Sequence, residues 1–318
     1  MKKINNKGFA ISTIIYSILI IAILIMGMLY STIAFRKKTS SDFTHKVEEE
    51  LNNLEIKSYT ICKKSTALHY SFGKLYSGDT LEVGDAFDCD VNGDGAFDTE
   101  NERFYYLAPE NGDTNSNNIV FIYFSNAETI NENGVTYPVA QKSSSVAYDS
   151  SASGGVVTYQ TKPSTAFSSL PSTASWKNTS LILPGDSENH KVNILDESGA
   201  KKVANFEYKD RSARFPRLSE LKSALGITTI YNDTTHTNSV NSTTYNFLFE
   251  RTDDFCSISN LSNCTYGYWI EEVSSSVKHN AWVFDAKNKK ITTAAGNNKD
   301  DYGIRPVIVV DRKNVYYK

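Results

Sequence analysis

The chain has 318 residues, which is enough for a membrane segment followed by one large domain or two small ones. Its formal net charge is only −3, which argues against nucleic acid as the main partner, because phosphate backbones attract clearly basic surfaces. Beyond residue 60 the chain is rich in Ser, Thr, Asn, Asp and Tyr, a composition that favours β structure with long polar loops.

A long uncharged segment follows a short basic leader at the N-terminus. The leader carries Lys2, Lys3 and Lys7, and no charged side chain occurs from Gly8 to Phe35. About 20 apolar residues cross a bilayer, whereas the apolar part of a secretory signal has about 7 to 15. The segment therefore predicts a membrane-spanning helix. It could be a plain uncleaved anchor, a secretory signal cleaved near residues 32–34, or the more specific segment described next.

The sequence Lys7-Gly8-Phe9 resembles the prepilin leader of type IV pilins and pseudopilins. In that family a membrane peptidase cleaves after the glycine, and the apolar helix is kept as membrane anchor and filament core. The resemblance implies cleavage between Gly8 and Phe9 by a prepilin peptidase, with other pilin-like subunits as partners. The chain departs from the family at the fifth mature position, where Thr13 replaces the usual glutamate. A hydroxyl cannot replace that charge, so polymerisation stays open.

The membrane helix is expected to continue beyond the bilayer. Phe43, Val47, Leu51 and Leu54 recur at spacings of four, four and three residues, which places them on one face of a helix. A helix from Phe9 to about residue 57 would carry its first half in lipid and pack its second half on a soluble head, as in pilins. A separate juxtamembrane helix or a short coiled coil is the alternative.

Four cysteines lie beyond the apolar segment: Cys62, Cys89, Cys256 and Cys264. Cys256 and Cys264 bracket a short polar loop and could form one disulfide, which would leave Cys62 with Cys89. Four cysteines allow three pairings, however, and unpaired thiols are a further alternative. No Cys-x-x-Cys pair is present, which argues against zinc and thioredoxin chemistry.

The sequence "DVNGDGAFD", residues 90–98, matches the first nine places of a calcium-binding loop. Its oxygen ligands would come from alternate positions: Asp90, Asn92, Asp94, the carbonyl of Ala96, and Asp98. The twelfth place should hold an acid, but it holds Asn101, with Glu100 and Glu102 on either side. The pattern predicts a calcium site, and the alternative is an ordinary polar turn with solvated acids.

Short strands and turns dominate the expected head. Residues 75–109 read as strands separated by turns, and residues 118–126 as a buried strand. Residues 141–180 read mostly as loop, with a short helix near 166–176. A helix is expected at about Ser219–Leu225, with Ser219 as its cap and Gly226 as its stop. The remaining strands are expected within four segments: 245–252, 266–273, 280–294 with a turn at 285–289, and 302–311.

The C-terminal part has a second resemblance. The segments "RFPRL" (214–218), "GYWIEE" (267–272), "AWVFDAKNKKI" (281–291) and "GIRPVIVV" (303–310) are similar in order to the C-type-lectin-like superfamily that includes formylglycine-generating-enzyme-like modules. The likeness covers residues 201–318 well and 65–140 loosely. It implies that the terminal strands pair within one domain and that Arg305 has a structural role. Sugar-binding tripeptides and a matching reactive cysteine pair are missing, so neither sugar binding nor enzyme activity is carried over.

The sequence therefore predicts an α+β protein with a leader (1–8), a transmembrane and amphipathic helix (9–57) and an extracellular β-rich head (58–318), loop-rich at 141–200 and lectin-like at 201–318. Hydrolase, zinc-protease and phosphate-binding motifs are absent, so no enzyme is expected. We expect a cell-surface, pilin-like structural or adhesive protein with a cytoplasmic N-terminus and an unidentified ligand. The alternative is a non-pilin surface receptor or adhesin with an uncleaved anchor.

Overall fold

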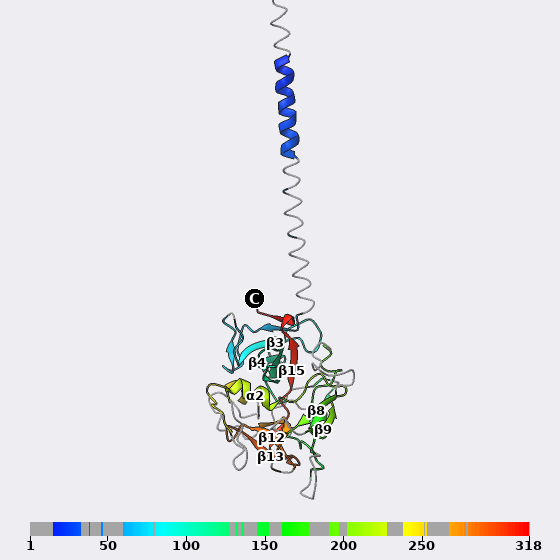
Figure 1. The fold of residues 1–318 in the computed structure, drawn as a ribbon, viewed down its shortest axis with the longest axis vertical. Coiled ribbons are helices and arrows are strands. Elements are labelled where there is room, and N and C mark those ends of the chain that lie inside the picture. The colour runs from blue at the N-terminus through cyan, green and yellow to red at the C-terminus, as the bar shows by residue number, and fades with distance from the viewer. Residues whose placement is uncertain are drawn as a thin grey trace, which may run out of the picture. The chain divides into compact units, whose positions relative to one another are not determined.

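The computed structural model divides the chain into two compact units, residues 1–59 and residues 60–318, which are described separately (Figure 1). The structure describes residues 15–32, 38, 46, 60–78, 80–126, 131–132, 135–136, 145–152, 161–178, 191–196, 202–227, 238–250, 252, 267–275, 277 and 279–317. We keep the name head for the second unit.

The first unit contains an apolar helix, as predicted. Residues Ile15–Thr32 form an α-helix of 18 residues with a mean hydropathy of 2.1, which by length and composition is enough to cross a membrane. Its two C-terminal hydroxyls are satisfied inside the helix, because Ser31 donates to the carbonyl of Gly27 and Thr32 to that of Met28. The stripe from Phe43 to Leu54 lies outside the described residues.

The main sheet of the head has seven strands and nearly closes on itself. Its order is β15-β5-β4-β3-β1-β16, and β2 pairs with β3 beside β1. The strands are β1 (Cys62–Lys64), β2 (Lys74–Leu75), β3 (Asp85–Cys89), β4 (Arg103–Pro109), β5 (Asn118–Tyr123), β15 (Val307–Asp311) and β16 (Val315–Tyr316). The two end strands of this order, β15 and β16, are joined by only one turn of 3₁₀ helix, η7 (Arg312–Asn314). The chain thus passes from one edge of the sheet to the other within three residues.

Buried apolar residues explain the strands at the centre of this sheet. The predicted strand at 118–126 is β5, and all but its first residue is buried. It pairs antiparallel with β15 in a register that places Val309 opposite Val120. Both strands consist largely of β-branched and aromatic residues, which pack well on a pleated surface. The predicted strand in "GIRPVIVV" is therefore confirmed.

The second sheet has five strands in the order β10-β13-β12-β11-β14. These are β10 (Asn238–Ser239), β11 (Gly267–Val273), β12 (Asn280–Asp285), β13 (Lys290–Ala295) and β14 (Tyr302–Gly303). The predicted hairpin is confirmed: β12 and β13 pair from Asn280 to Asp285, and Asn288 donates its amide and its side chain to Asp285 in the turn. Figure 1 shows β12 and β13 at the end of the head away from the C-terminus.

Two hairpins complete the described strands. One joins β6 (Asn131–Glu132) to β7 (Val135–Thr136), and the other joins β8 (Lys191–Leu195) to β9 (Lys202–Glu207). The strand β8 lies within residues 141–200, the segment that was expected to be rich in loops. Polar residues alternate with apolar ones in "KVNIL", so the strand signal was present but short.

The helix α2 spans Leu218–Leu225 and differs from the prediction at its start. Arg217, not Ser219, is the N-cap, and its backbone N–H donates to the carboxylate of Glu220 at 3.0 Å. Gly226 ends the helix in the left-handed conformation at φ 65°, as predicted. The helix contacts both β4 and β11, so it connects the two sheets.

Shorter helices account for the remaining described elements. They are η1 (Glu110–Gly112), η3 (Ala166–Ser169) and η5 (Asn246–Phe249). The strand expected within residues 245–252 is wrong, because this segment forms η5. Phe247, Leu248 and Phe249 are all buried, and Arg305 donates to the carbonyls of Phe247 and Leu248, both at 2.7 Å. A strand would direct those carbonyls to a neighbouring strand instead.

Arg305 has the structural role expected of it. The side chain is fully buried, and its Nε donates to the carbonyl of Tyr123 at 2.6 Å. With the two carbonyls of η5, this guanidinium therefore joins β5 to η5 from a position just before β15. Burial lowers the pKa of this guanidinium.

Candidate functional site

The acidic loop folds around the carboxylate of Asp90. That carboxylate accepts hydrogen bonds from the backbone N–H groups of Gly93 at 2.8 Å, Asp94 at 3.1 Å and Gly95 at 3.0 Å. Gly93 and Gly95 take positive φ values of 75° and 81°, which glycine adopts without strain. The first predicted ligand is thus the centre of a tight turn.

The other predicted ligands also bind amides of their own loop. Asn92 accepts from the N–H of Asp94 at 2.8 Å, and Asp94 accepts from that of Ala96 at 2.7 Å. Asp98 accepts from the side-chain amide of Asn101 and from the N–H of Glu100, both at 2.8 Å. Burial raises the pKa of Asp98, but these hydrogen bonds outweigh it and lower the pKa. Each of these side chains accepts from the N–H two residues further along the chain, and this series of side-chain-to-backbone turns fixes the conformation of the loop.

Glu102 enters this loop from the place after Asn101. Its side chain is buried, and it accepts from the N–H groups of Val91 and Asn92 at 3.2 Å and from that of Asp98 at 3.1 Å. Burial raises the pKa of Glu102 to about 7, and the charges of neighbouring acids add to the shift. The sequence named Glu102 only as a flanking acid, because a standard calcium loop has its last ligand one place earlier.

The oxygen atoms of this loop suit calcium chemically, since calcium binds hard oxygen ligands. Among the described residues, however, no group of three or more His, Cys, Asp or Glu side chains is arranged to hold a metal ion. The side chains of Asp90, Asn92 and Asp94 already accept from loop amides. Calcium binding at this loop therefore stays a prediction.

Cys62 and Cys89 form a disulfide, which selects one of the pairings left open by the sequence. They are direct partners in the antiparallel pairing of β1 with β3, and both are fully buried. The acidic loop begins at the next residue, and the N–H of Asp90 donates to the carbonyl of Ile61 at 2.9 Å. The disulfide thus lies at the base of the acidic loop. Cys256 and Cys264, like Gly8, Phe9 and Thr13, lie outside the described residues.

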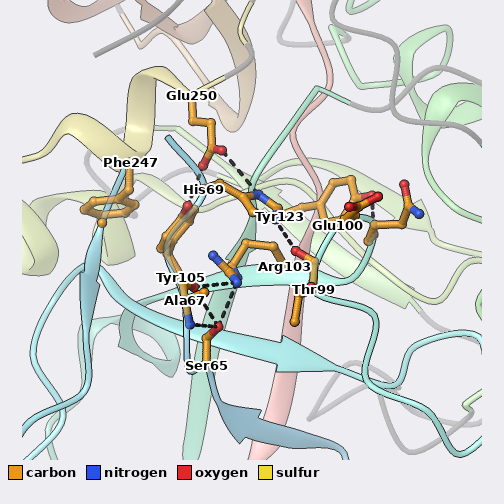
Figure 2. Close-up of polar contacts among 12 residues, drawn as sticks. Ser65, Ala67, His69, Thr99, Glu100, Arg103, Tyr105, Tyr123, Phe247 and Glu250 are labelled. Carbon is orange, nitrogen blue, oxygen red and sulfur yellow. Dashed lines mark hydrogen bonds and ion pairs between the residues drawn. The ribbon is translucent and has the colours of Figure 1, made fainter. Parts of the chain in front are cut away.

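A second polar group, which no motif indicated, lies inside the head (Figure 2). We call it the buried polar cluster after its three fully buried members, Arg103, Tyr105 and Glu250. Its other members are His69, which is partly buried, and Thr99, which is exposed. The hydroxyl of Tyr105 donates to Oε2 of Glu250 at 2.5 Å, and Nδ1 of His69 lies 3.4 Å from Oε1 of the same carboxylate. The other ring nitrogen of His69 contacts the carbonyl of Thr99.

Arg103 forms the second half of this cluster. Its Nε donates to Asp88 at 2.8 Å, and its Nη2 donates to Ser65 at 2.7 Å and to the carbonyl of Ala67 at 2.8 Å. Arg103 and Asp88 are both buried. Removing only one partner of such a buried ion pair costs much free energy, because the other charge is left buried and unpaired. Nη1 of Arg103 and Oε1 of Glu250 are buried without a hydrogen-bond partner among the described residues.

A turn with unusual backbone geometry adjoins the cluster. Tyr70 and Ser71 take positive φ values of 45° and 69°, and Gly73 takes 68°. Asn246 holds this turn from η5, because its carboxamide accepts from the N–H of Gly73 at 2.9 Å and donates to the carbonyl of Ser71 at 3.1 Å. Phe72 is buried and anchors the turn, whereas Tyr70 is 72% exposed.

A pocket of about 370 Å³ lies beside this turn. Its lining residues are Gly73, Lys74, Val83, Gly84, Ala224, Thr243, Thr244, Tyr245, Asn246 and Phe247. Lys74 is paired with Glu82, and Asn246 is committed to the turn. The strongest polar groups of the pocket therefore already have partners within the chain.

The conspicuous sequence segments of the C-terminal part meet at a third cluster. Arg217 of "RFPRL" donates through Nε to Glu271 of "GYWIEE" at 2.8 Å, and Tyr208 donates to the same carboxylate at 2.7 Å. Arg214 is fully buried, and its backbone exchanges hydrogen bonds with Val307 of "GIRPVIVV". Three separate segments are thus joined where α2 contacts β11.

No family model, no curated protein and no solved structure matches this chain.

Proposed function

We propose that this protein is a membrane-anchored surface protein with a prepilin-type leader. The observation that carries the proposal is the helix Ile15–Thr32, which is long and apolar enough to cross a membrane and begins a few residues after Lys7-Gly8-Phe9. A helix kept after cleavage at Gly8 would anchor the head, with the lipid bilayer, a prepilin peptidase and other pilin-like subunits as partners.

The disulfide supports placing the head outside the cell. Cys62–Cys89 joins two buried strand residues, and bonds of this kind persist in oxidising compartments. The N-terminus then lies in the cytoplasm. We assign the head a role in display or adhesion rather than catalysis, because the charged groups of its described clusters hold strands and turns together.

We also propose a C-type-lectin-like fold for the C-terminal part. Two observations support it. The terminal strands β1 and β16 pair with each other, as expected of that superfamily. The segments "RFPRL", "GYWIEE" and "GIRPVIVV" contact one another through Arg217, Glu271 and the backbone of Arg214. Neither sugar binding nor any other ligand follows from this likeness.

Intact mass of the mature protein tests the leader. Co-expression with a prepilin peptidase should yield a protein that begins at Phe9, and Gly8→Val should leave the leader attached. Gly27→Val is the matched control, because Gly27 lies in the apolar helix with open space around it and should not affect cleavage. A wild-type protein that retains Met1 would leave the non-pilin receptor or adhesin with an uncleaved anchor.

A further inference from the structure

We infer that the head modifies itself at Asn92, which is converted after folding into an aspartyl or isoaspartyl residue. The reaction is an intramolecular deamidation, in which the backbone nitrogen of Gly93 displaces the side-chain nitrogen of Asn92 as ammonia. The structure places a base and a hydrogen-bond donor at the reacting atoms. The inference goes beyond the proposed surface function and depends neither on the leader nor on calcium binding.

Asn92 and Gly93 leave room for this reaction. Glycine has no Cβ, so no side chain shields the nitrogen that must attack the Cγ of Asn92. Gly93 is exposed to water, and a Cβ built on it would have no neighbour closer than 3.7 Å. Among the described residues, Asn92 forms hydrogen bonds through its backbone N–H and its Oδ1. Its Nδ2, the leaving group, is therefore not held in place.

Asp90 is placed as the base. Its Oδ1 accepts from the N–H of Gly93 at 2.8 Å, so the proton that must leave this nitrogen already points at a carboxylate. The N–H bond lies in the peptide plane, and the electrons that attack Cγ lie perpendicular to that plane, so the two contacts do not compete. Asp90 is only 8% exposed, and the N–H groups of Asp94 and Gly95 hold its carboxylate in position. A base fixed in this way needs no reorganisation before the reaction.

The backbone of Asp94 activates the other reacting group. Its N–H donates to Oδ1 of Asn92 at 2.8 Å. Negative charge develops on this oxygen when the nitrogen of Gly93 attacks Cγ. A donor that already faces the oxygen stabilises that charge, in the same way as an oxyanion hole. The base and the donor thus act on the two ends of the bond-forming pair.

The reaction needs only water as a co-reactant. The nitrogen of Gly93 forms a bond to Cγ of Asn92 while its proton passes to Asp90. The bond between Cγ and Nδ2 then breaks, and Asp90 returns the proton to the departing ammonia. Water opens the resulting cyclic imide at either of its carbonyls, which gives an aspartyl or an isoaspartyl residue. The acidic loop gains one negative charge.

A second Asn-Gly pair in the head, Asn111 with Gly112, provides an internal comparison. Oδ1 of Asn111 accepts from Nη1 of Arg217 at 2.6 Å, so this side-chain amide is polarised as well. Gly112 is the last residue of η1, and its N–H donates to no side chain among the described residues. This pair therefore has a donor but lacks the base. Folding should accelerate the conversion of Asn92 and not that of Asn111.

Mass spectrometry of the aged protein tests this inference. The full chain is incubated in detergent micelles, and in parallel in denaturant, and the conversion of each asparagine is followed in peptides. Asn92 should be converted at least roughly tenfold faster in the folded chain than in the denatured chain. Asp90→Asn should remove this acceleration, because a carboxamide oxygen still accepts from Gly93 but does not take up its proton. Asp98→Asn is the matched control and should keep the wild-type rate, since Asp98 accepts from Glu100 and Asn101 and not from Gly93.

Three results would overturn the inference. The first is a wild-type Asn92 that is converted no faster in the folded chain than in the denatured chain, a comparison that needs no variant and stands even if Asp90→Asn does not fold. The second is a folded Asp90→Asn protein with the wild-type rate. The third is a product that contains aspartate without isoaspartate, because direct attack of water on the side chain would then replace the attack by Gly93.

Discussion

Arg217 lies at the start of α2, and its Nε donates to Glu271 on β11 at 2.8 Å. Only 17% of the Arg217 side chain and 5% of the Glu271 side chain are exposed, so the pair is largely removed from water. The Glu271 carboxylate also accepts a hydrogen bond from the hydroxyl of Tyr208, and the backbone N–H of Glu271 donates to the carbonyl of Pro216. One carboxylate thus connects the helix, a strand and the residue that follows β9.

Removing this carboxylate should be costly. Glu271→Ala leaves Arg217 without its ionic partner in a mostly buried site, and we expect the free energy of unfolding to fall by about 3 kcal/mol. Denaturant unfolding of the full chain in detergent measures the loss. Lys313→Ala is the control, because Lys313 pairs with Asp311 on the surface and should cost less than about 1 kcal/mol. Equal effects of the two substitutions would contradict a structural role for Glu271.

The neighbouring Glu272 should make stability depend on pH. Burial and then the charge of Glu271 raise the pKa of Glu272 from 4.5 to about 8. In the folded protein the Glu272 carboxyl therefore keeps its proton at pH values where the unfolded chain has lost it. The free energy of unfolding should fall as pH rises from about 4.5 to about 8. The loss is on the order of 5 kcal/mol, since each pH unit of that range contributes about 1.4 kcal/mol. Glu272→Gln should remove this part of the pH dependence, since its amide oxygen can still accept from Leu218.

Unfolding free energies measured across that range provide the comparison. The matched control is Glu207→Gln, because the Glu207 side chain is exposed on β9. It should leave the slope of stability against pH unchanged. A Glu272→Gln protein with the wild-type slope would show that another group binds the proton.

Gly267 should tolerate no side chain. A Cβ at this position would lie 1.6 Å from the carbonyl oxygen of Phe284, where β11 and β12 approach each other. Because that neighbour is backbone, the strands would have to separate, and Gly267→Ala should cost about 3 kcal/mol or more. Gly78→Ala is the control, since its Cβ would have no neighbour closer than 3.9 Å. Thermal unfolding would detect the difference, and a Gly267→Ala protein as stable as Gly78→Ala would refute this packing.

The disulfide should contribute mainly through the unfolded chain. Cys62 and Cys89 are 27 residues apart, and closing a loop of that length is worth about 3 to 4 kcal/mol in the chain-entropy description. Replacing both cysteines by alanine should lower the free energy of unfolding by about this amount. A stability unaffected by the double substitution would mean that the strands β1 and β3 pair fully without the bond.

Calcium is tested most directly by melting temperature. If the acidic loop binds the ion only when folded, the full chain should gain about 2.7 kcal/mol at a hundredfold excess over Kd and melt several degrees higher than in chelator. Asp94→Ala should abolish the gain, and Asp300→Ala, an exposed acid outside the loop, should retain it. A wild-type melting temperature that calcium does not change would return residues 90–98 to an ordinary polar turn.

The parts of the fold that the sequence predicted well depend on local patterns. The helix at residues 15–32 follows from the lack of charge, β5 from a run of apolar residues, and the end of α2 from Gly226. The sequence predicts a strand where η5 forms, because a short run of apolar and aromatic residues is consistent with a buried strand and with a buried helix alike. Its conformation depends on Arg305, which is 57 and 58 residues away from the carbonyls that it binds.

The site residues that the sequence indicated also make local contacts, whereas those that it missed make long-range ones. The acidic loop was visible because its side chains bind amides only two to five residues away. The buried polar cluster was not, because Tyr105 and Glu250 are 145 residues apart and no spacing rule connects them. Five scattered histidines offered no reason to single out His69. Long-range polar contacts of this kind leave no periodic signal in a sequence.

The position of β15 and β16 at the two ends of one sheet has a consequence for biosynthesis. β1 starts at Cys62 and pairs with Val315, close to the end of the chain. The sheet therefore cannot be completed until nearly the whole head has been synthesised and, in the proposed topology, exported. Contacts between such distant residues form slowly. A chain that stops before Val307 would lack both end strands and expose β5 and β1 as unpaired edges, which makes incomplete copies prone to aggregation.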